Sequence, residues 1–200
     1  MNAPDIRAVT LDDLEAVYDI CLRTAASGED ASDIYTDPRL PGEVYAAPYL
    51  VVPEGVGFVA IDSGGVAGYV LGAADTAAFE RACEESWWPA LRVAHPDPGP
   101  APATWDDRMR ALIHRPRETP PELLGDYPAH LHIDLLPRLQ GQGAGRALME
   151  TFLGLLHHAG VRGVHLGVAA CNLNAIGFYR RLGFATLVES EEALVLGVRW

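Results

Sequence analysis

A short run of small and amide side chains has the composition of a phosphate-binding loop. It reads Gln140-Gly141-Gln142-Gly143-Ala144-Gly145, follows an alternating strand-like run over 130–136, and opens a long apolar helix. The first N–H groups of a helix have no partner within it, and the helix dipole places positive charge beside them. Because glycine and alanine let an anion approach the backbone closely, this loop predicts a pyrophosphate site.

Two common nucleotide-binding loops are excluded. A Walker A loop needs a Lys-Ser or Lys-Thr pair, and the chain contains no lysine. A dinucleotide fold needs Gly-x-Gly-x-x-Gly early in the chain and an acidic residue about 20 positions later, and neither feature is present. The loop therefore indicates a different carrier of pyrophosphate.

Polar side chains alternate along the strand-like run before the loop. His130, His132 and Asp134 are two residues apart, so in a strand all three share one face. The ordinary pKa of histidine suits proton transfer near neutral pH, and an aspartate can orient a base or bind a cationic amine. These three residues are candidates for chemistry beside the loop. The other histidines lack the spacing of a metal-binding set, so no metal site is expected.

The elements that must position these residues form a mixed α/β pattern. The first half predicts mostly antiparallel strands, and the second half predicts a βαβ unit. Expected strands cover 6–9, 57–61, 66–71, 130–136, 161–168, 183–187 and 193–198, and expected helices cover 14–22, 40–46, 143–159 and 174–182.

A long segment over 75–128 separates the hairpin strands from the strand that carries the histidines. It begins with a helical pattern over 75–93, passes through a proline-rich stretch, and continues with a second amphipathic segment. Its length and its tryptophans, Trp87, Trp88 and Trp105, favour an insertion that forms a lid or pocket wall, with a structural cap on the core as the alternative. We expect one domain over 1–200 that contains this insertion.

A second motif lies about thirty residues after the loop. Gln140-x-x-Gly143-x-Gly145 followed by Asn172-x-x-Ala175-x-x-Phe178-Tyr179-x-x-x-Gly183-Phe184 resembles motifs A and B of the GCN5-related N-acetyltransferases (GNAT). Within that superfamily, the residues Ala-Asp-Thr after the hairpin, the insertion and the stretch 127–134 are similar to bacterial acetyltransferases that resemble the C-terminal domain of O-GlcNAcase.

The resemblance implies a GNAT fold, a twisted and mostly antiparallel sheet with a splayed central strand pair, and acetyl-CoA (coenzyme A) as the cofactor. Backbone N–H groups over Gln140–Arg146 would hold the pyrophosphate, and the backbone of Leu135 and Leu136 would pair with pantetheine. The hydroxyl of Tyr179 would protonate the departing thiolate. The residues expected to line the cofactor further along are Asn172, Ala175, Phe178 and Tyr179.

The resemblance also implies transfer of an acetyl group by direct attack of a primary amine on the thioester. The amine would be a small cationic molecule, a lysine or a protein N-terminus. Its base would be His132, Asp134 or His130, and a base acting through water is the alternative. A different class of function stays open, a catalytically inactive acyl-CoA-binding module with the same fold.

Charge and cysteine content narrow the partners. The net charge is −12, which argues against nucleic acid and anionic membranes as partners. Residues 138–181 carry +4 and the remainder −16, which suits an anionic cofactor and a cationic substrate. Three isolated cysteines in apolar contexts are expected to be buried free thiols. With no signal-peptide pattern at the N-terminus, we expect a cytoplasmic bacterial enzyme, monomeric or homodimeric.

Overall fold

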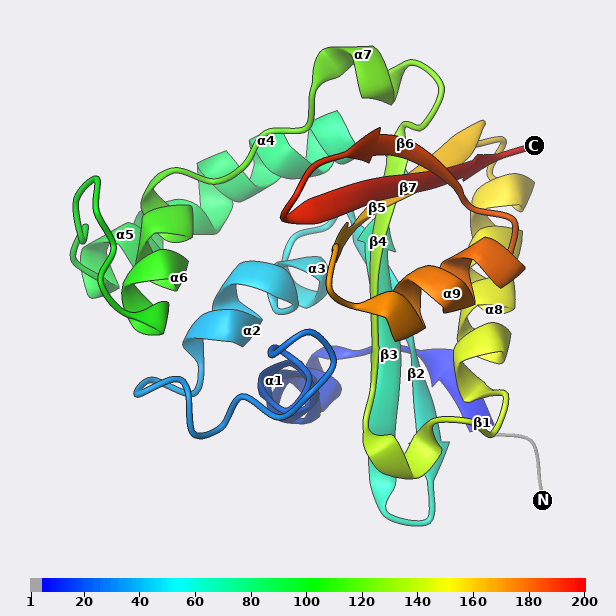
Figure 1. Cartoon of the computed structure of the whole chain (residues 1–200), viewed down its shortest axis with the longest axis horizontal. Coiled ribbons are helices and arrows are strands. Elements are labelled where there is room, and N and C mark those ends of the chain that lie inside the picture. The colour runs from blue at the N-terminus through cyan, green and yellow to red at the C-terminus, as the bar shows by residue number, and fades with distance from the viewer. Residues whose placement is uncertain (1–4) are drawn as a thin grey trace.

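The computed structural model describes residues 5–200 and has one seven-stranded sheet (Figure 1). The strand order is β1-β2-β3-β4-β5-β7-β6, and every neighbouring pair is antiparallel except β4 and β5. The strands are β1 (Asp5–Ala8), β2 (Gly55–Asp62), β3 (Gly65–Ala73), β4 (Ala129–Leu135), β5 (Gly163–Ala169), β6 (Ala185–Glu189) and β7 (Ala193–Arg199). The expectation of a mixed, mostly antiparallel sheet is confirmed.

Helices cover both faces of the sheet. The helices are α1 (Leu14–Leu22), α2 (Leu40–Tyr45), α3 (Pro48–Val51), α4 (Thr76–Ser86), α5 (Trp88–Ala94), α6 (Trp105–His114), α7 (Pro121–Leu124), α8 (Ala144–His158) and α9 (Leu173–Arg181). Short 3₁₀ turns lie at Leu11–Asp13 and Pro137–Leu139. Helix α8 packs on β2–β4 from one side, and α1 and α3 pack from the other.

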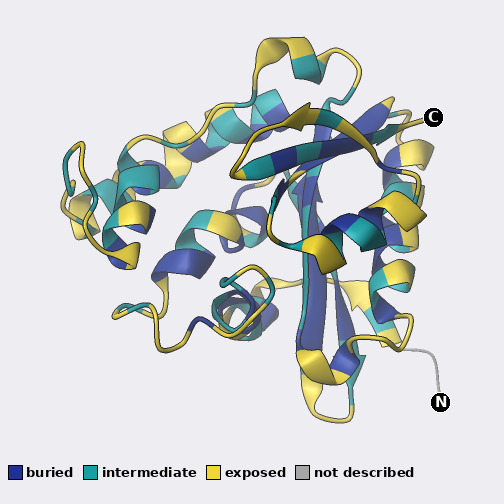
Figure 2. Cartoon of the chain, in the orientation of Figure 1, coloured by how far each residue is buried: buried dark blue, intermediate teal, exposed yellow. Residues whose placement is uncertain are grey.

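The sheet separates two apolar cores, as expected when alternate strand residues point to opposite faces. On the α8 side, Val70 and Leu131 pack with Phe152. On the α1 side, Tyr69 and Leu71 pack with residues of α1–α6. Figure 2 shows the central strands as the buried middle layer between these two sides.

Strands β4 and β5 separate soon after they begin. The two strands pair only at Ala129↔Val164 and His130↔His165. On the other edge of β4, the Leu136 N–H donates to the carbonyl of Ala67 in β3. Because the backbone groups of successive strand residues point to alternate edges, those of residues 131, 133 and 135 point toward β5. Beyond His130, β5 is too far away to accept them. The implied splayed strand pair is therefore present.

The insertion between β3 and β4 contains four helices, α4 to α7. The expectation of one helical segment over 75–93 is wrong, because the chain bends at Trp87 and restarts as α5 with Pro89 in its first turn. Proline lacks an N–H and clashes with the preceding turn, so the first helix cannot continue through it. Helix α3 is an element that the sequence patterns did not predict.

The expectation that the N-terminus has no signal-peptide pattern rests partly on residues 1–4, which lie outside the described residues. Within residues 5–200, no helix combines the length and the apolar character needed to cross a lipid bilayer.

Candidate active site

A cleft of about 560 Å³ opens where β4 and β5 separate. One wall is the loop between β4 and α8, and another is α9 with the residue that caps it. The third wall is the loop that follows α1. The cleft therefore brings together three segments that are far apart in the sequence, at the edge where the sheet leaves backbone groups unpaired.

The loop before α8 presents its backbone to this cleft. Gly141 and Gly143 have φ of 71° and 86°, a left-handed conformation that favours glycine, and a Cβ at either position would project into open space. The first intrahelical donor is the N–H of Ala147, which bonds to the carbonyl of Gly143. The N–H groups from Gly143 to Arg146 make no backbone hydrogen bond within the described residues, so they are available to bind an anion at the start of a fifteen-residue helix.

Side chains hold this loop in place from behind. The Gln140 amide donates to the carbonyl of Leu135 at 2.8 Å, and the Gln142 amide donates to the carbonyl of Arg138 at 2.6 Å. Arg138 in turn donates to Asp62 in the hairpin at 2.8 Å. The two glutamines therefore shape the loop, which lines the cleft together with Arg146.

One expected cofactor contact is placed away from the cleft, and two others are limited to the backbone. The Gln142 side chain points back to Arg138 and the Ala144 side chain is buried in the core beneath α8, so only their backbone N–H groups are available to a pyrophosphate. The expected pairing of pantetheine with Leu136 is wrong, because the N–H of Leu136 already donates to Ala67 at 2.8 Å and its side chain is buried. The strand alternation that exposes the backbone of residue 135 turns that of residue 136 toward β3.

Helix α9 forms the opposite wall and contributes four of the expected residues. Asn172 caps the helix, because its side-chain oxygen accepts from the N–H of Ala175 at 3.0 Å. The Phe178 ring lies 3.4 Å from where a Cβ on Gly145 would sit, so glycine lets α8 and α9 approach closely. All these residues and Tyr179 line the cleft.

The Tyr179 hydroxyl faces the cleft without a protein partner. Its side chain is 7% exposed, and no hydrogen bond to the hydroxyl exists within residues 5–200. Burial, and secondly the charge of Asp134, raise the pKa of Tyr179. The hydroxyl is therefore protonated at neutral pH and free to donate to a ligand.

Asp134 is the one member of the histidine–aspartate face that lines the cleft. Tyr69, its cross-strand neighbour on β3, donates to Asp134 Oδ2 at 2.7 Å. Burial raises the pKa of Asp134, and the hydroxyls of Tyr69 and Thr24 partly oppose the shift. The half-buried carboxylate is thus held in one orientation and has more affinity for a proton than an exposed aspartate.

His130 lies deeper and both of its ring nitrogens are occupied. Thr76 Oγ1 donates to the carbonyl of Pro128, so it accepts from His130 Nδ1 at 2.9 Å. His130 Nε2 then accepts from the Tyr49 hydroxyl at 2.7 Å. Burial, with the charges of His132 and His165, holds the pKa of His130 well below its usual value. This neutral imidazole lies outside the cleft and has no lone pair free to act as a base.

His132 lies between the other two, against the aromatic residues of α2 and α3. Its ring centroid is 6.1 Å from that of Tyr45 and 5.6 Å from that of Tyr49. Burial, and secondly the charge of His165, lower the pKa of His132 to about 4. His132 is neutral at physiological pH and does not line the cleft with Asp134 and Tyr179.

The loop after α1 contributes cleft residues that sequence reasoning missed. They are Thr24, Ser27, Gly28 and Glu29. No local motif marks them, because only the fold brings this loop to the start of α9, where Ser27 Oγ lies 3.5 Å from Cys171 Sγ. The expectation that all three cysteines are buried is wrong for Cys171, which is exposed in the turn between β5 and α9.

Comparison with known proteins assigns this arrangement to a family. A family model described as the acetyltransferase (GNAT) family matches residues 24–184. Mycothiol acetyltransferase from Geodermatophilus obscurus is 36% identical over 148 residues, which are 68% of this chain and 47% of that protein. The chain spans about half the length of the curated relatives it matches.

Solved structures support the same assignment. The crystal structure of SsHAT is 44% identical, with a TM-score of 0.91 over 99% of this chain and 98% of that chain. The PaiA N-acetyltransferase from Thermoplasma acidophilum, solved in complex with coenzyme A, is 12% identical with a TM-score of 0.56 over 100% of both chains, which is a likeness of fold alone. With most of its length matched by the family model, the chain belongs to the GNAT family of acetyltransferases.

Proposed function

We propose that the protein is an acetyl-CoA-dependent N-acetyltransferase that acts on a primary amine. The observation that carries the proposal is the placement of Asp134 and Tyr179 in one cleft with the unpaired N–H groups before α8. A carboxylate, a neutral hydroxyl and an anion site are the groups that acyl transfer from a phosphate-bearing carrier requires.

The cleft suits acetyl-CoA, which supplies an activated acetyl thioester when bound. The N–H groups of residues 143–146 and the guanidinium groups of Arg146 and Arg181 would hold the pyrophosphate. The backbone of Ile133 and the N–H of Leu135 would pair with the amides of pantetheine, because these groups face the gap left by β5, whereas the Leu135 carbonyl already accepts from Gln140. A cleft of about 560 Å³ also has room for an extended ligand.

Asp134 would bind the ammonium form of the acceptor and take its proton at a carboxylate oxygen. The nucleophile must be a neutral amine, so a base has to remove that proton in the cleft. Tyr69 donates to Oδ2 and leaves Oδ1 for the acceptor. The raised pKa makes Asp134 a better base than an exposed aspartate.

Tyr179 would hold a proton at Oη and donate it within the cleft. Its raised pKa keeps the hydroxyl protonated at neutral pH. The neutral His130 and His132 would serve as a rigid wall behind Asp134 rather than as the base. The narrower resemblance to acetyltransferases that are similar to the O-GlcNAcase domain stays a prediction, and the four-helix insertion is the feature in its favour.

The test combines binding with turnover. Acetyl-CoA is titrated by calorimetry, and release of the coenzyme A thiol is then followed with a panel of primary amines. We expect saturable binding, amine-dependent thiol release, and acetylated amine by mass spectrometry. A Tyr179→Phe variant should bind acetyl-CoA normally and lose most turnover. Binding without turnover for any amine would identify an inactive binding module, and absence of binding would refute the proposal.

A further inference from the structure

We infer that the acceptor is an amine that carries an aromatic ring, and that the ring binds in a second cavity beside the cleft. The cavity measures about 240 Å³ and is lined by small and aromatic side chains, among them Ala26, Ile34, Tyr35 and Trp105. Apolar cavities of about 150 Å³ already take up a benzene molecule in other proteins. This inference rests on the proposed function, because it names the substrate class of the same site.

The second cavity continues the acceptor side of the cleft. Four consecutive residues after α1 connect the two, since Thr24 lines the cleft, Ala25 and Ala26 line the cavity, and Ser27 lines both. Thr24 also lies close enough to Asp134 for its hydroxyl to lower the pKa of that carboxyl. A ligand whose ammonium group pairs with Asp134 would therefore reach the cavity along Thr24 and Ser27.

The outer wall of the cavity is an aromatic pair from two distant segments. The ring centroids of Tyr35 and Trp105 are 6.4 Å apart at an interplanar angle of 67°, an edge-to-face contact. The Arg108 guanidinium lies 4.3 Å from the Trp105 centroid and covers part of that ring. Trp105 is nevertheless 48% exposed, which leaves a large apolar surface without a protein partner.

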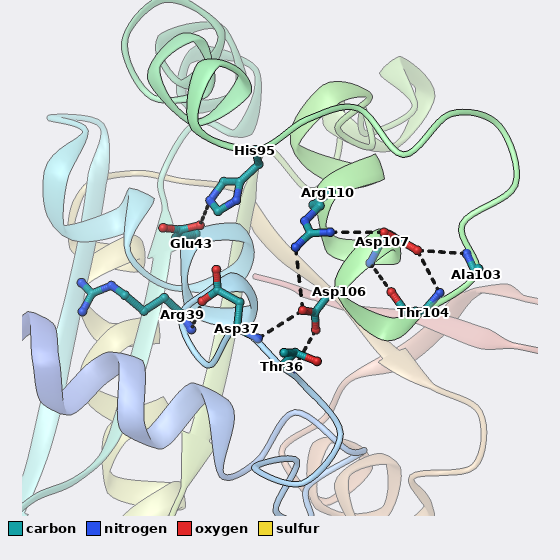
Figure 3. A network of polar contacts seen from close by, with 10 residues as sticks. All are labelled: Thr36, Asp37, Arg39, Glu43, His95, Ala103, Thr104, Asp106, Asp107 and Arg110. Carbon is teal, nitrogen blue, oxygen red and sulfur yellow. Dashed lines mark hydrogen bonds and ion pairs between the residues drawn. The ribbon is translucent and has the colours of Figure 1, made fainter.

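Buried polar contacts fix this wall in advance. The Asp106 carboxylate is nearly buried and accepts from the backbone N–H groups of Thr36 and Asp37 at 3.0 and 3.1 Å (Figure 3). The contact ties the start of α6 to the loop that carries Tyr35. Thr104 and Asp107 cap α6 through a reciprocal pair of hydrogen bonds. A wall held this way loses little entropy when a ring binds against it.

The chemistry of the two ends selects a ring-bearing amine. Asp134 in the cleft favours an ammonium group, and no charged side chain lines the second cavity within the described residues. An acceptor with a second charge in that position, such as a polyamine, would have to desolvate it against Ala26 and Ile34 without a counter-ion. An arylalkylamine satisfies both ends.

The test measures acetylation of matched amines by the full chain. Phenethylamine, tyramine and tryptamine are compared with ethylamine, spermidine and a lysine-containing peptide. We expect kcat/KM at least tenfold higher for the ring-bearing amines. Trp105→Ala and the cavity-filling Ala26→Leu should each raise KM for phenethylamine at least fivefold and leave ethylamine turnover and acetyl-CoA affinity unchanged. Trp200→Ala is the matched control, a tryptophan of similar exposure that lines neither cavity.

The outcomes separate the inference from the proposed function. Acetyl-CoA binding and amine turnover without preference for a ring would overturn the inference and leave the proposed function intact. A preference for spermidine or the peptide, or no turnover of any ring-bearing amine, would overturn it as well. Failure of acetyl-CoA to bind would remove the proposed function itself. Circular dichroism of each variant shows whether a loss of activity reflects unfolding.

Discussion

The proposed cofactor side of the cleft and its proposed acceptor side are built from different kinds of atoms. The proposed cofactor side uses backbone groups, namely the N–H groups of residues 143–146 and the edge of β4 that does not pair with β5. The acceptor side uses side chains from β4, from the loop after α1 and from α6. The first side depends on local chain geometry, and the second depends on how three distant segments are packed together.

This difference predicts that substitutions can change the acceptor while the cofactor site is kept. A backbone anion site tolerates many changes as long as glycine permits the loop conformation. A side-chain pocket changes its preference with one substitution. Variants on the two sides should therefore affect different constants, and the following experiments test that separation.

The largest effect is expected from Asp134→Asn. Removal of the proposed base should lower kcat/KM by roughly 10²- to 10⁴-fold, because an amide cannot take the proton of the acceptor. The dissociation constant of acetyl-CoA, measured by calorimetry, should stay the same. The near-isosteric change keeps an acceptor oxygen for Tyr69, so stability should change little. Full activity of this variant would exclude Asp134 as the base.

A complementary effect on the cofactor side is expected from Gly143→Val. The backbone of Gly143 has a φ of 86°, and a residue with a branched side chain adopts that conformation at a cost of roughly 1–2 kcal/mol or more. The new side chain would also project into the cleft. We expect acetyl-CoA to bind roughly tenfold to a hundredfold more weakly, since 1.4 kcal/mol corresponds to tenfold. Gly154→Val, an exposed position in the same helix, is the control. Equal affinity of both variants would argue against the loop as the anion site.

A smaller effect is expected from Tyr69→Phe, through the pH dependence of turnover. The Tyr69 hydrogen bond favours the ionised form of Asp134, so its loss should raise the pKa of that carboxyl further. Because the base acts when ionised, activity falls as the pH drops through this pKa. The acid limb of the kcat/KM profile should therefore move to higher pH by about one unit.

Tyr18→Phe is the control for that shift, since Tyr18 is buried against α2 and lines neither cavity. If Tyr69→Phe lowers kcat at every pH equally and leaves the limb in place, the role of Tyr69 is structural only.

The smallest effect is expected at the ion pair that precedes α1. Asp13, before α1, accepts two hydrogen bonds from Arg7 at 2.6 and 2.7 Å, which together with Thr10 lower its pKa to about 2. Its stabilisation is present above the unfolded pKa of 3.8 and is lost as the pH falls toward 2. Asp13→Asn should lower the free energy of unfolding by about 1–2 kcal/mol at pH 7, with a vanishing difference near pH 2 in denaturant titrations.

Local patterns predicted the parts of the fold in which neighbouring residues determine the conformation. The hairpin of β2 and β3 and the helix after the glycine loop depend on residues within one or two turns. The break at Pro89 was missed because the apolar period continues across it. The orientation of the Leu136 backbone was missed because it depends on register with β3, which strand composition does not reveal.

The acceptor side shows the limit of such reasoning. The alternation of His130, His132 and Asp134 correctly predicted that the three residues share one face of the strand. It did not predict that they lie at different depths. Only the packing of α2 and α3 buries the two histidines among tyrosines and leaves Asp134 in the cleft. The meeting of Tyr35 with Trp105 likewise has no counterpart in local sequence.

The sequence by itself determined the anion loop, the helix it opens and the second motif that faces it, because glycine conformation and helix termini are local properties. The tertiary structure alone decided which of three candidate side chains reaches the cleft and what the acceptor meets there. Burial and pKa depend on neighbours brought together from across the chain, and those neighbours are set by packing rather than by spacing along it.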